Sequence, residues 1–343
     1  PPQLHEGYVK NALDYVRLAE RVNGPIPRPV GFDYIWGDAL AELAHYAPDL
    51  RIVNLETAVT RSEDWEAKGI NYRMHPDNLG ALSAAGVDCC VLANNHVLDW
   101  GVQGLRETLT SLRGAGIHTA GAGPDRARAH APAALSIPGA GRVLVFARAA
   151  QDSGVPRHWA AQARRPGVAL LDELSVRAAA VLADEIAQAK APGDLAVVSL
   201  HWGGNWGYGV PGQHRRFAHA LIEAGAADIV HGHSSHHVKA MEVYRGHPIL
   251  YGCGDLLTDY EGIGGYEHYR GDLGLMYFVT MEAATGRLLR IEMSPTRMRG
   301  LRINRASPAD AEWLRDVLER ESRRFGVQVA LRTDGRLQAH WSG

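Results

Sequence analysis

The sequence predicts an α/β fold, and three observations carry this prediction. Segments with helical spacing of apolar residues alternate with short apolar runs along most of the chain. Several runs stop at a carboxylate, an amide or an imidazole, which is how α/β proteins present ligands at the carboxyl ends of their strands. Later runs follow one another through short turns without helices between them. An antiparallel region is therefore expected beside the alternating core.

Helical spacing marks seven segments. The clearest covers residues 101–115, where Leu105, Leu109 and Leu112 fall on one face and Gly114 marks the end. Another covers residues 37–46 and starts at Gly37-Asp38. The remaining predicted helices cover residues 8–21, 77–85, 173–190, 211–224 and 308–325. After the last helix we expect a short polar tail.

Apolar runs bounded by turn residues mark the predicted strands. These cover residues 50–53, 89–93, 133–137, 142–147, 195–200, 227–230, 240–244, 249–251, 273–281 and 288–293. The stretch 151–166 has no periodicity, and a loop of that length in a compact domain is either functional or mobile. Without an internal repeat, one continuous domain over residues 1–343 is expected, with its motifs in 52–255 and a C-terminal helix and tail in 307–343.

The composition is that of an ordinary globular protein, and the partner we expect is a small-molecule or peptide-like substrate. Hydrophobic residues make up 46% and charged residues 22% of the chain, close to average usage. The net charge of -2 and the scattered basic residues argue against a nucleic acid or an anionic membrane as the principal partner. No apolar run approaches the ~20 residues that cross a bilayer, and the first residues show no signal-peptide pattern. The oligomeric state is left open.

The chain has three cysteines, and they favour a reducing compartment. Cys89 and Cys90 are adjacent within a predicted strand, which is not the spacing of a disulfide framework. Buried free thiols fit the cytoplasm, which is the location we expect. A secreted or anchored form, with further residues upstream of Pro1, is the alternative.

Two candidate functional motifs lie in the first third of the chain. Glu56 follows an apolar run, and its two carboxylate oxygens could bridge two cations; a helix-capping or salt-bridged acid is the alternative. Asn95 offers a hard amide oxygen to a metal, and the adjacent His96 could protonate a leaving group. A plain polar turn is the alternative for this pair. Asp99 could fix the tautomer of His96 or cap the following helix.

Two further motifs follow later strands. His201 ends one run and opens a loop rich in glycine and tryptophan, although a lone histidine is more often structural. The segment 231–237 holds four histidines, which packing alone does not explain. Imidazole together with carboxylate and amide oxygen suits zinc, iron or manganese. We expect His233 and His236 to bind metal, with His231 and His237 behind them.

With these motifs assembled, the chain resembles the bacterial capsule-synthesis (CapA, poly-γ-glutamate) family, a branch of the calcineurin-like metallophosphoesterases. The resemblance runs in the family's order from about Ile52 to Asp255. It rests on the segments Val53-Asn54-Leu55-Glu56-Thr57, Leu92-Ala93-Asn94-Asn95-His96-Val97-Leu98-Asp99, Val198-Ser199-Leu200-His201-Trp202-Gly203-Gly204, Gly232-His233 through His236, and Glu242-Val243-Tyr244 leading to Ile249-Leu250-Tyr251-Gly252.

The resemblance implies a four-layer αββα sandwich, metallophosphatase-like, with mixed sheets and a two-metal site at the strand ends. It implies that Glu56 adjoins both divalent ions (Mn, Fe or Zn), that Asn95, His201, His233 and His236 are ligands, and that His96 is the acid facing the substrate. The family's opening strand ends in a Gly-Asp whose aspartate binds metal, and we expect this aspartate to be absent from the chain. Either it belongs to residues upstream of Pro1, or the site lacks this ligand and holds one metal or none. Gly37-Asp38 does not replace that pair, since it is predicted to start a helix.

Three functions are open at this point. The first is a metal-dependent hydrolase or amide-transfer enzyme of capsule synthesis, active on a γ-glutamyl or related amide, with Arg73, Trp202 and Asn205 contacting the substrate. The second is a phosphoesterase, with Arg73, Arg157 or Lys239 as anion clamps. The third is a non-catalytic assembly or binding protein that retains the fold.

Overall fold

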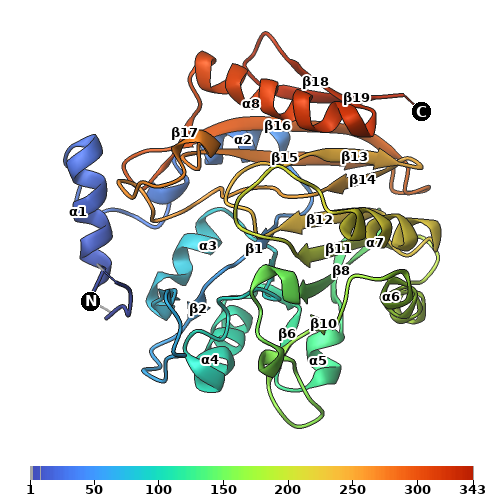
Figure 1. Cartoon of the computed structure of the whole chain (residues 1–343), viewed down its shortest axis with the longest axis horizontal. Helices are drawn as coiled ribbons and strands as arrows, with labels where there is room; N and C mark the ends of the chain where they lie inside the picture. The colour runs from blue at the N-terminus through green and yellow to red at the C-terminus, as the bar shows by residue number, and fades with distance from the viewer. Residues whose placement is uncertain (1–2, 8, 343) are drawn as a thin grey trace.

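A seven-stranded sheet forms the centre of the protein. The computed structural model describes residues 3–7 and 9–342 (Figure 1). The sheet has the order β10-β8-β11-β12-β14-β13, and β7 pairs with the first half of β8, on the same edge as β10 and opposite β11. The bounds are β7 Ala133–Ile137, β8 Gly141–Ala150, β10 Leu170–Leu171, β11 Leu195–His201, β12 Ile229–His233, β13 Met241–Tyr244 and β14 His247–Leu250. Strands β10, β8, β11, β12 and β14 are parallel, so their carboxyl ends meet at one edge of the sheet.

Two helices cover one face of this sheet. Helix α6 (Val176–Ala189) starts where the Ser175 hydroxyl accepts the amide of Ala178 at 3.1 Å, and α7 is Gly212–Glu223. Both helices bury apolar side chains against alternate residues of β8 and β11. The cluster includes Phe146, Leu182, Ile186, Val198, Phe217 and Leu221. Because the opposite face is also buried, these strands are apolar on both sides, as parallel strands usually are.

A second, three-stranded parallel sheet shares a core with the other face. Its order is β1-β4-β5, with bounds β1 Ile52–Asn54, β4 Cys89–Val91 and β5 His118–Ala120. One hydrophobic cluster joins this sheet to Val143, Val145 and Ala147 of β8. The same cluster contains residues of α2 (Ala39–Tyr46), α3 (Gly80–Ala84) and α4 (Gly101–Gly114). The fold is therefore mixed α/β with several sheets, in agreement with the expected fold class.

The C-terminal part forms an antiparallel sheet. Its order is β15-β16-β19-β18, and β17 pairs with β16. The bounds are β15 Leu273–Met281, β16 Leu288–Met298, β17 Ile303–Arg305, β18 Val327–Leu331 and β19 Leu337–Trp341. Helix α8 (Pro308–Ser322) packs on it through Leu314 and Leu318, which share a buried cluster with Ile291. The expected antiparallel region is thus confirmed.

The expected polar tail after residue 325 is wrong. Residues 327–341 form a β-hairpin, in which Val327 and Val329 of β18 and Leu337 and Ala339 of β19 are buried. These residues alternate with more exposed ones, which is the period of a strand with one covered face. Asp334-Gly335 supplies the turn, where Gly335 adopts a φ of 82°.

Shorter elements complete the chain. Two strand pairs are β2 (Ala58–Val59) with β3 (Arg73–Met74) and β6 (Ala122–Gly123) with β9 (Gly167–Val168), and α5 is Arg126–His130. Helix α1 (Ala12–Asn23) begins at an Asn11 cap; Tyr8, the first residue of the predicted helix 8–21, lies outside the described residues. The stretch 151–166 is a loop, as predicted; it holds two short 3-10 turns, η3 (Gln151–Ser153) and η4 (Arg157–Trp159), and isolated bridges at Ala160 and between Gln162 and Arg165.

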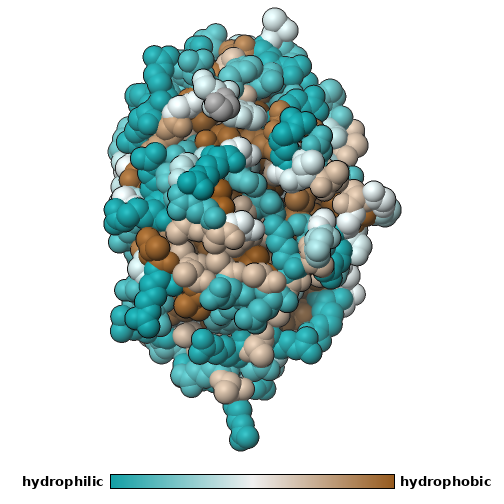
Figure 2. Space-filling model, turned by 90° about the vertical axis from the view of Figure 1, so that its right-hand side faces the viewer, coloured by the Kyte–Doolittle hydropathy of each residue, from teal (hydrophilic) through white to brown (hydrophobic). Residues whose placement is uncertain are grey.

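The surface is mostly polar on the side that carries α6 and α7. On this face, hydrophilic side chains surround separate hydrophobic patches (Figure 2). Within residues 3–7 and 9–342, none of the helices combines the length and the apolar character that a bilayer crossing requires.

Candidate metal centre

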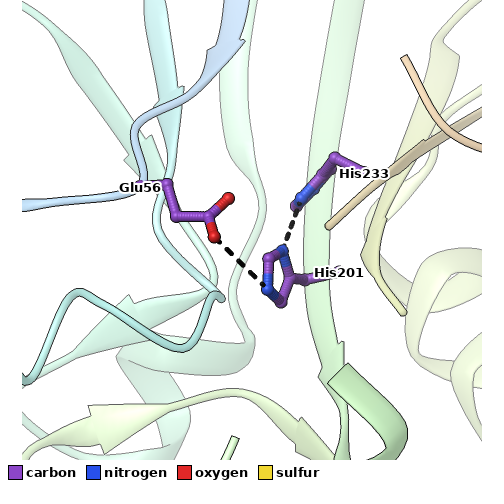
Figure 3. Close-up of side chains that lie close together, drawn as sticks. All are labelled: Glu56, His201 and His233. Carbon is purple, nitrogen blue, oxygen red and sulfur yellow. Dashed lines mark hydrogen bonds and ion pairs between the residues drawn. The ribbon is translucent and has the colours of Figure 1, made fainter. Parts of the chain in front are cut away.

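Two neighbouring parallel strands each end in a histidine of the candidate site. His201 is the last residue of β11 and His233 the last residue of β12, and the two are register partners in the sheet. Glu56 reaches the same point from the loop that follows β1, so its carboxylate faces the two imidazoles (Figure 3). One ligand atom of each residue lies within 4.8 Å of the others. The convergence follows from the parallel topology, which places strand ends at one edge.

Direct contacts hold this group together. His201 Nδ1 lies 2.9 Å from His233 Nδ1, and its Nε2 lies 3.1 Å from the amide oxygen of Asn95 and 3.9 Å from Glu56 Oε1. Ser199, two residues before His201 on β11, contacts His233 Nε2 at 2.9 Å. The structure therefore brings Glu56, Asn95, His201 and His233 together from four separate segments.

Burial sets the charge of these groups. It lowers the pKa of His201 to about 3, with smaller contributions from His96 and His236, and it lowers the pKa of His233 as well. Burial also raises the pKa of Glu56 to about 7, aided by Asp255 and opposed by His236. Both imidazoles are thus neutral, with lone pairs available, and the buried Glu56 carboxylate is compensated only in part by His236. These residues fit a divalent cation of intermediate softness.

His236 lies apart from the group of three. Its Nδ1 is 2.9 Å from the Asp255 carboxylate, and its backbone amide donates to the Asn205 carbonyl at 3.0 Å. Burial would lower its pKa, but Asp255 and then Glu56 raise it to about 9. His236 is therefore a cation facing Glu56, while His201 and His233 are neutral.

A second cluster, on the segment after β4, carries the candidate acid. His96 Nδ1 lies 2.6 Å from Asp99 Oδ2, and Asp99 also accepts the amide of Tyr72 and the amine of Lys68, both at 2.7 Å. The Tyr72 ring stacks on the imidazole, with centroids 3.9 Å apart. Asp99 is fully buried and does not cap α4, whose preceding residue, Trp100, has no side-chain cap. Of the two roles considered for Asp99, the contacts are those that fix a tautomer.

Asn94 joins the two clusters. Its side-chain amide donates to Asn54 Oδ1 at 3.0 Å and to the Leu55 carbonyl at 2.9 Å, and its oxygen accepts the amides of His96 and Val97 at 3.1 and 3.0 Å. Asn54 in turn donates to Glu56 Oε2 at 2.8 Å. All four hydrogen-bonding positions of this fully buried amide are in use.

The other two histidines of segment 231–237 support the site from behind. His231 is 3.0 Å from Ser199 Oγ, the hydroxyl that also contacts His233. His237 accepts the backbone amide of Gly207 at 3.0 Å and stacks with Tyr269, with centroids 4.5 Å apart. One histidine thus steadies a candidate ligand, and the other steadies the loop after β11.

The three residues expected to contact substrate are placed differently from one another. Arg73 lies over the Trp100 ring at 3.8 Å and donates to the carbonyls of Ser62 and Gln3, so it anchors the N-terminal segment and is not brought to the cluster. Trp202 is buried and donates to the Tyr251 carbonyl at 3.0 Å. Asn205 is exposed beside His236. Arg73 and Trp202 are occupied by internal contacts, and only Asn205 presents its side chain to solvent.

Three residues that contact the site were missed from the sequence. Lys68 donates to the Asn95 carbonyl at 2.5 Å as well as to Asp99, and Asp255 pairs with His236. Asp152 accepts the Gly203 amide at 3.0 Å and lies 2.7 Å from His214 Nε2. Asp152 lies in the long loop 151–166, which was predicted to be functional or mobile, so that loop was a usable signal. No pattern in the residues around Lys68 indicated that it would contact the site.

The fold and the site define a mixed α/β protein with a carboxylate–imidazole cluster that could hold a metal ion at its strand ends. The family model "Bacterial capsule synthesis protein PGA_cap" matches residues 7–260, and the chain belongs to this family. The resemblance found in the motifs is therefore confirmed.

Named relatives agree with this assignment. A protein of Mycobacterium tuberculosis named "Probable polyglutamine synthesis accessory protein" is 50% identical over 344 residues, which cover 98% of this chain and 89% of the relative. "PGA biosynthesis protein CapA" of Bacillus subtilis is 29% identical over 266 residues, with 77% of this chain and 64% of the relative covered. "Capsule biosynthesis protein CapA" of Bacillus anthracis is 29% identical and covers 56% of this chain and 45% of the relative.

Proposed function

We propose that this chain is a metal-dependent enzyme of poly-glutamate synthesis, acting on a γ-glutamyl or related amide by hydrolysis or transfer. The observation that carries the proposal is the convergence of Glu56, His201 and His233 at the strand ends, beside His96 and Asp99. The names of the relatives, which refer to polyglutamine and PGA synthesis, support the link to polymer synthesis, and the γ-glutamyl amide is our proposal within it. We also propose that the layers described above form the four-layer metallophosphatase sandwich.

Glu56, Asn95, His201 and His233 would hold the first ion, and His236 with Glu56 would adjoin a second. Zinc, iron or manganese suits this donor set. Bound metal would polarise the amide carbonyl and supply a hydroxide nucleophile at neutral pH. For His236 to bind, its imidazole must give up the proton that Asp255 and Glu56 stabilise, so metal binding at that position releases a proton.

His96 would handle the leaving group. Its Nδ1 is fixed by Asp99, so Nε2 is the nitrogen left to face a substrate. Asp99 opposes the effect of burial, which lowers the pKa of His96, and so stabilises the protonated imidazole that must donate to the leaving amine. Lys68 donates hydrogen bonds to Asp99 and to the Asn95 carbonyl. These bonds fix the position of the candidate acid His96 relative to the candidate ligand Asn95.

A second candidate is a non-catalytic role in poly-glutamate synthesis. The word "accessory" in the name of the Mycobacterium tuberculosis relative favours it. The phosphoesterase hypothesis loses one of its three anion clamps, because the Arg73 guanidinium is engaged by Trp100 and backbone carbonyls.

Elemental analysis combined with a substrate panel separates these candidates. Full-length protein is expected to carry at least one transition metal and to turn over γ-glutamyl peptides in preference to aryl phosphates. His233→Ala should lose both properties. His247→Ala is the matched control, because this histidine lies at the opposite, amino end of β14. Metal below stoichiometry together with no effect of His233→Ala would favour the non-catalytic role; preference for aryl phosphates would favour the phosphoesterase.

A further inference from the structure

The chain has only four lysines, and one of them lacks a partner. Lys10 donates to the Glu6 carbonyl, Lys68 to Asp99 and Lys190 to Asp228. Within the described part of the chain, the amine of Lys239 makes no hydrogen bond and no ion pair, although only 7% of the residue is exposed. A buried ammonium normally needs an acceptor, so this one is available to an external acceptor.

The amine of Lys239 is sheltered but reaches solvent. Its aliphatic stem fills the space beside Gly252, where an added Cβ would lie 2.9 Å from Lys239 Cδ. The Nζ atom of Lys239 is not fully buried, although the residue as a whole is only 7% exposed. The aliphatic stem is therefore covered, while the amine keeps some access to water. Such a group can be reached by a ligand without unfolding.

Charges of both signs surround this amine. Burial and then the positive charge of Arg324 lower the pKa of Lys239 to about 8, while Asp152 and Glu321 oppose both. Arg324 itself pairs with Glu321 at 3.5 Å, and none of these carboxylates bonds to the Lys239 amine. Arg324 donates to the Tyr208 carbonyl at 3.1 Å. A carboxylate placed here would relieve the repulsion between two cationic side chains and would accept a charge-assisted hydrogen bond.

The position of Lys239 connects it with the candidate site. It lies three residues beyond His236, and its stem rests on Gly252, which is in the segment that leads to Asp255. Asp255 is the partner of His236, and Asp152 holds the loop that begins at His201. The lysine is thus carried by the same two segments that place the candidate ligands.

We propose that Lys239 binds a side carboxylate of a glutamyl chain and so forms a substrate subsite of this protein. The proposal rests on the proposed function for its substrate class. It requires an anionic, multi-residue ligand and would make the protein prefer glutamyl chains over neutral peptides. The ion pair would form on binding and break on release, without any covalent step.

Amine labelling tests the subsite independently of catalysis. Metal-stripped protein is treated with trinitrobenzenesulfonate at about pH 8, near the pKa of Lys239, and each lysine is quantified by peptide mass spectrometry. Lys239 should react fastest, and a γ-glutamyl oligomer should slow its labelling by about fivefold or more without changing Lys190, the paired internal control. An oligomer of γ-glutamine, which lacks the charge, should not protect.

Unchanged labelling in the presence of the glutamyl oligomer would overturn the proposal. Protection by inorganic phosphate but not by the oligomer would also overturn it and would favour the phosphoesterase. Protection without any turnover would leave the subsite standing and remove only the proposed catalysis. Failure of the proposed subsite and failure of the proposed catalysis therefore give different results.

Two variants extend the test to turnover. Lys239→Met keeps the length of the stem and should raise KM for γ-glutamyl substrates about tenfold with kcat nearly unchanged, the pattern of a lost binding contact. Lys239→Arg keeps the charge and should recover most of that loss. Equal KM values for both variants and the wild-type protein would contradict the assignment, provided that thermal unfolding shows all three folded.

Discussion

The candidate site contains two kinds of histidine, which differ in their charge. His201 and His233 are buried at strand ends next to other imidazoles and an amide, and burial keeps them neutral. His236, on the loop after β12, is also largely enclosed, yet Asp255 raises its pKa to about 9. The comparison teaches that a carboxylate partner, and not burial alone, decides whether an imidazole here is a neutral donor or a cation.

The largest expected effect comes from removing a neutral imidazole. His201→Ala should weaken metal binding by about 10²-fold or more, because it removes a lone pair and leaves Asn95 and Glu56 without their common neighbour. Competition with a chromogenic chelator measures the affinity. His340→Ala, which changes an exposed histidine of β19, should bind as the wild-type protein does. Equal affinities for both variants would contradict the assigned ligand.

Removing the candidate acid should separate chemistry from metal binding. His96→Gln should lower kcat by about 10²- to 10⁴-fold while the metal content stays unchanged, since His96 contacts Asp99 and no member of the group of three. Steady-state kinetics and elemental analysis of the same preparation provide the check. A parallel loss of metal would mean that His96 is a ligand.

Removing the carboxylate partner should convert the charged histidine into a neutral one. In metal-stripped Asp255→Asn protein, the pKa of His236 should fall from about 9 toward its ordinary value of about 6.5, as followed by NMR titration. A folded-state pKa raised above the unfolded value stabilises the protein fully below about pH 6.5, and this contribution is lost as the pH rises through about 9. Wild-type protein should therefore lose up to about 3 kcal/mol across this window, and the variant much less.

The smallest expected effect concerns a buried cation on the neighbouring strand β8, where Arg148 is the register partner of Leu200. Arg148 is 1% exposed and pairs with Glu185 at 2.5 Å, while contacts with His130 and then Arg148 lower the pKa of Glu185 to about 2. A carboxylate whose pKa is lowered in the folded state stabilises the protein fully above about pH 4.5. This contribution is lost as the pH falls toward 2. Glu185→Gln should cost about 1–2 kcal/mol at neutral pH, because Glu185 is 35% exposed and water screens the pair.

The metal content should not change in Glu185→Gln. Urea unfolding at neutral pH and near pH 3 gives the two stabilities, and their difference should shrink in the variant. A variant as stable as the wild-type protein at neutral pH would show that water already satisfies Arg148.

The sequence was most informative where one strand end carries one polar residue. His201 and His233 were found because an apolar run stops at each, and parallel pairing then brings the two runs level. It was least informative where a contact joins distant segments. Lys68 meets Asp99 across 31 residues and Asp255 meets His236 across 19, and no local period encodes either contact. Arg73 was misplaced for the same reason, since its partner Trp100 lies 27 residues away in the chain.

The fold shows the same division. Helices with a sustained apolar face were predicted close to their observed bounds, as at 101–115 against Gly101–Gly114. The two-residue strands β2 and β9 are set by their neighbours and gave no recognisable pattern. The hairpin at 327–341 differs, because its period-two alternation and its Asp334-Gly335 turn were present in the sequence and were overlooked.

The saturated amide of Asn94 has a consequence for how this protein can change over generations. A replacement there would disturb Glu56 and His96 in a single step, so the proposed cation binding and the proposed proton delivery would be lost together. Descendants that abandon the proposed catalysis are then expected to decay at this codon early. Those that keep it must retain a side chain with two donors and two acceptors at the same reach, which asparagine alone provides.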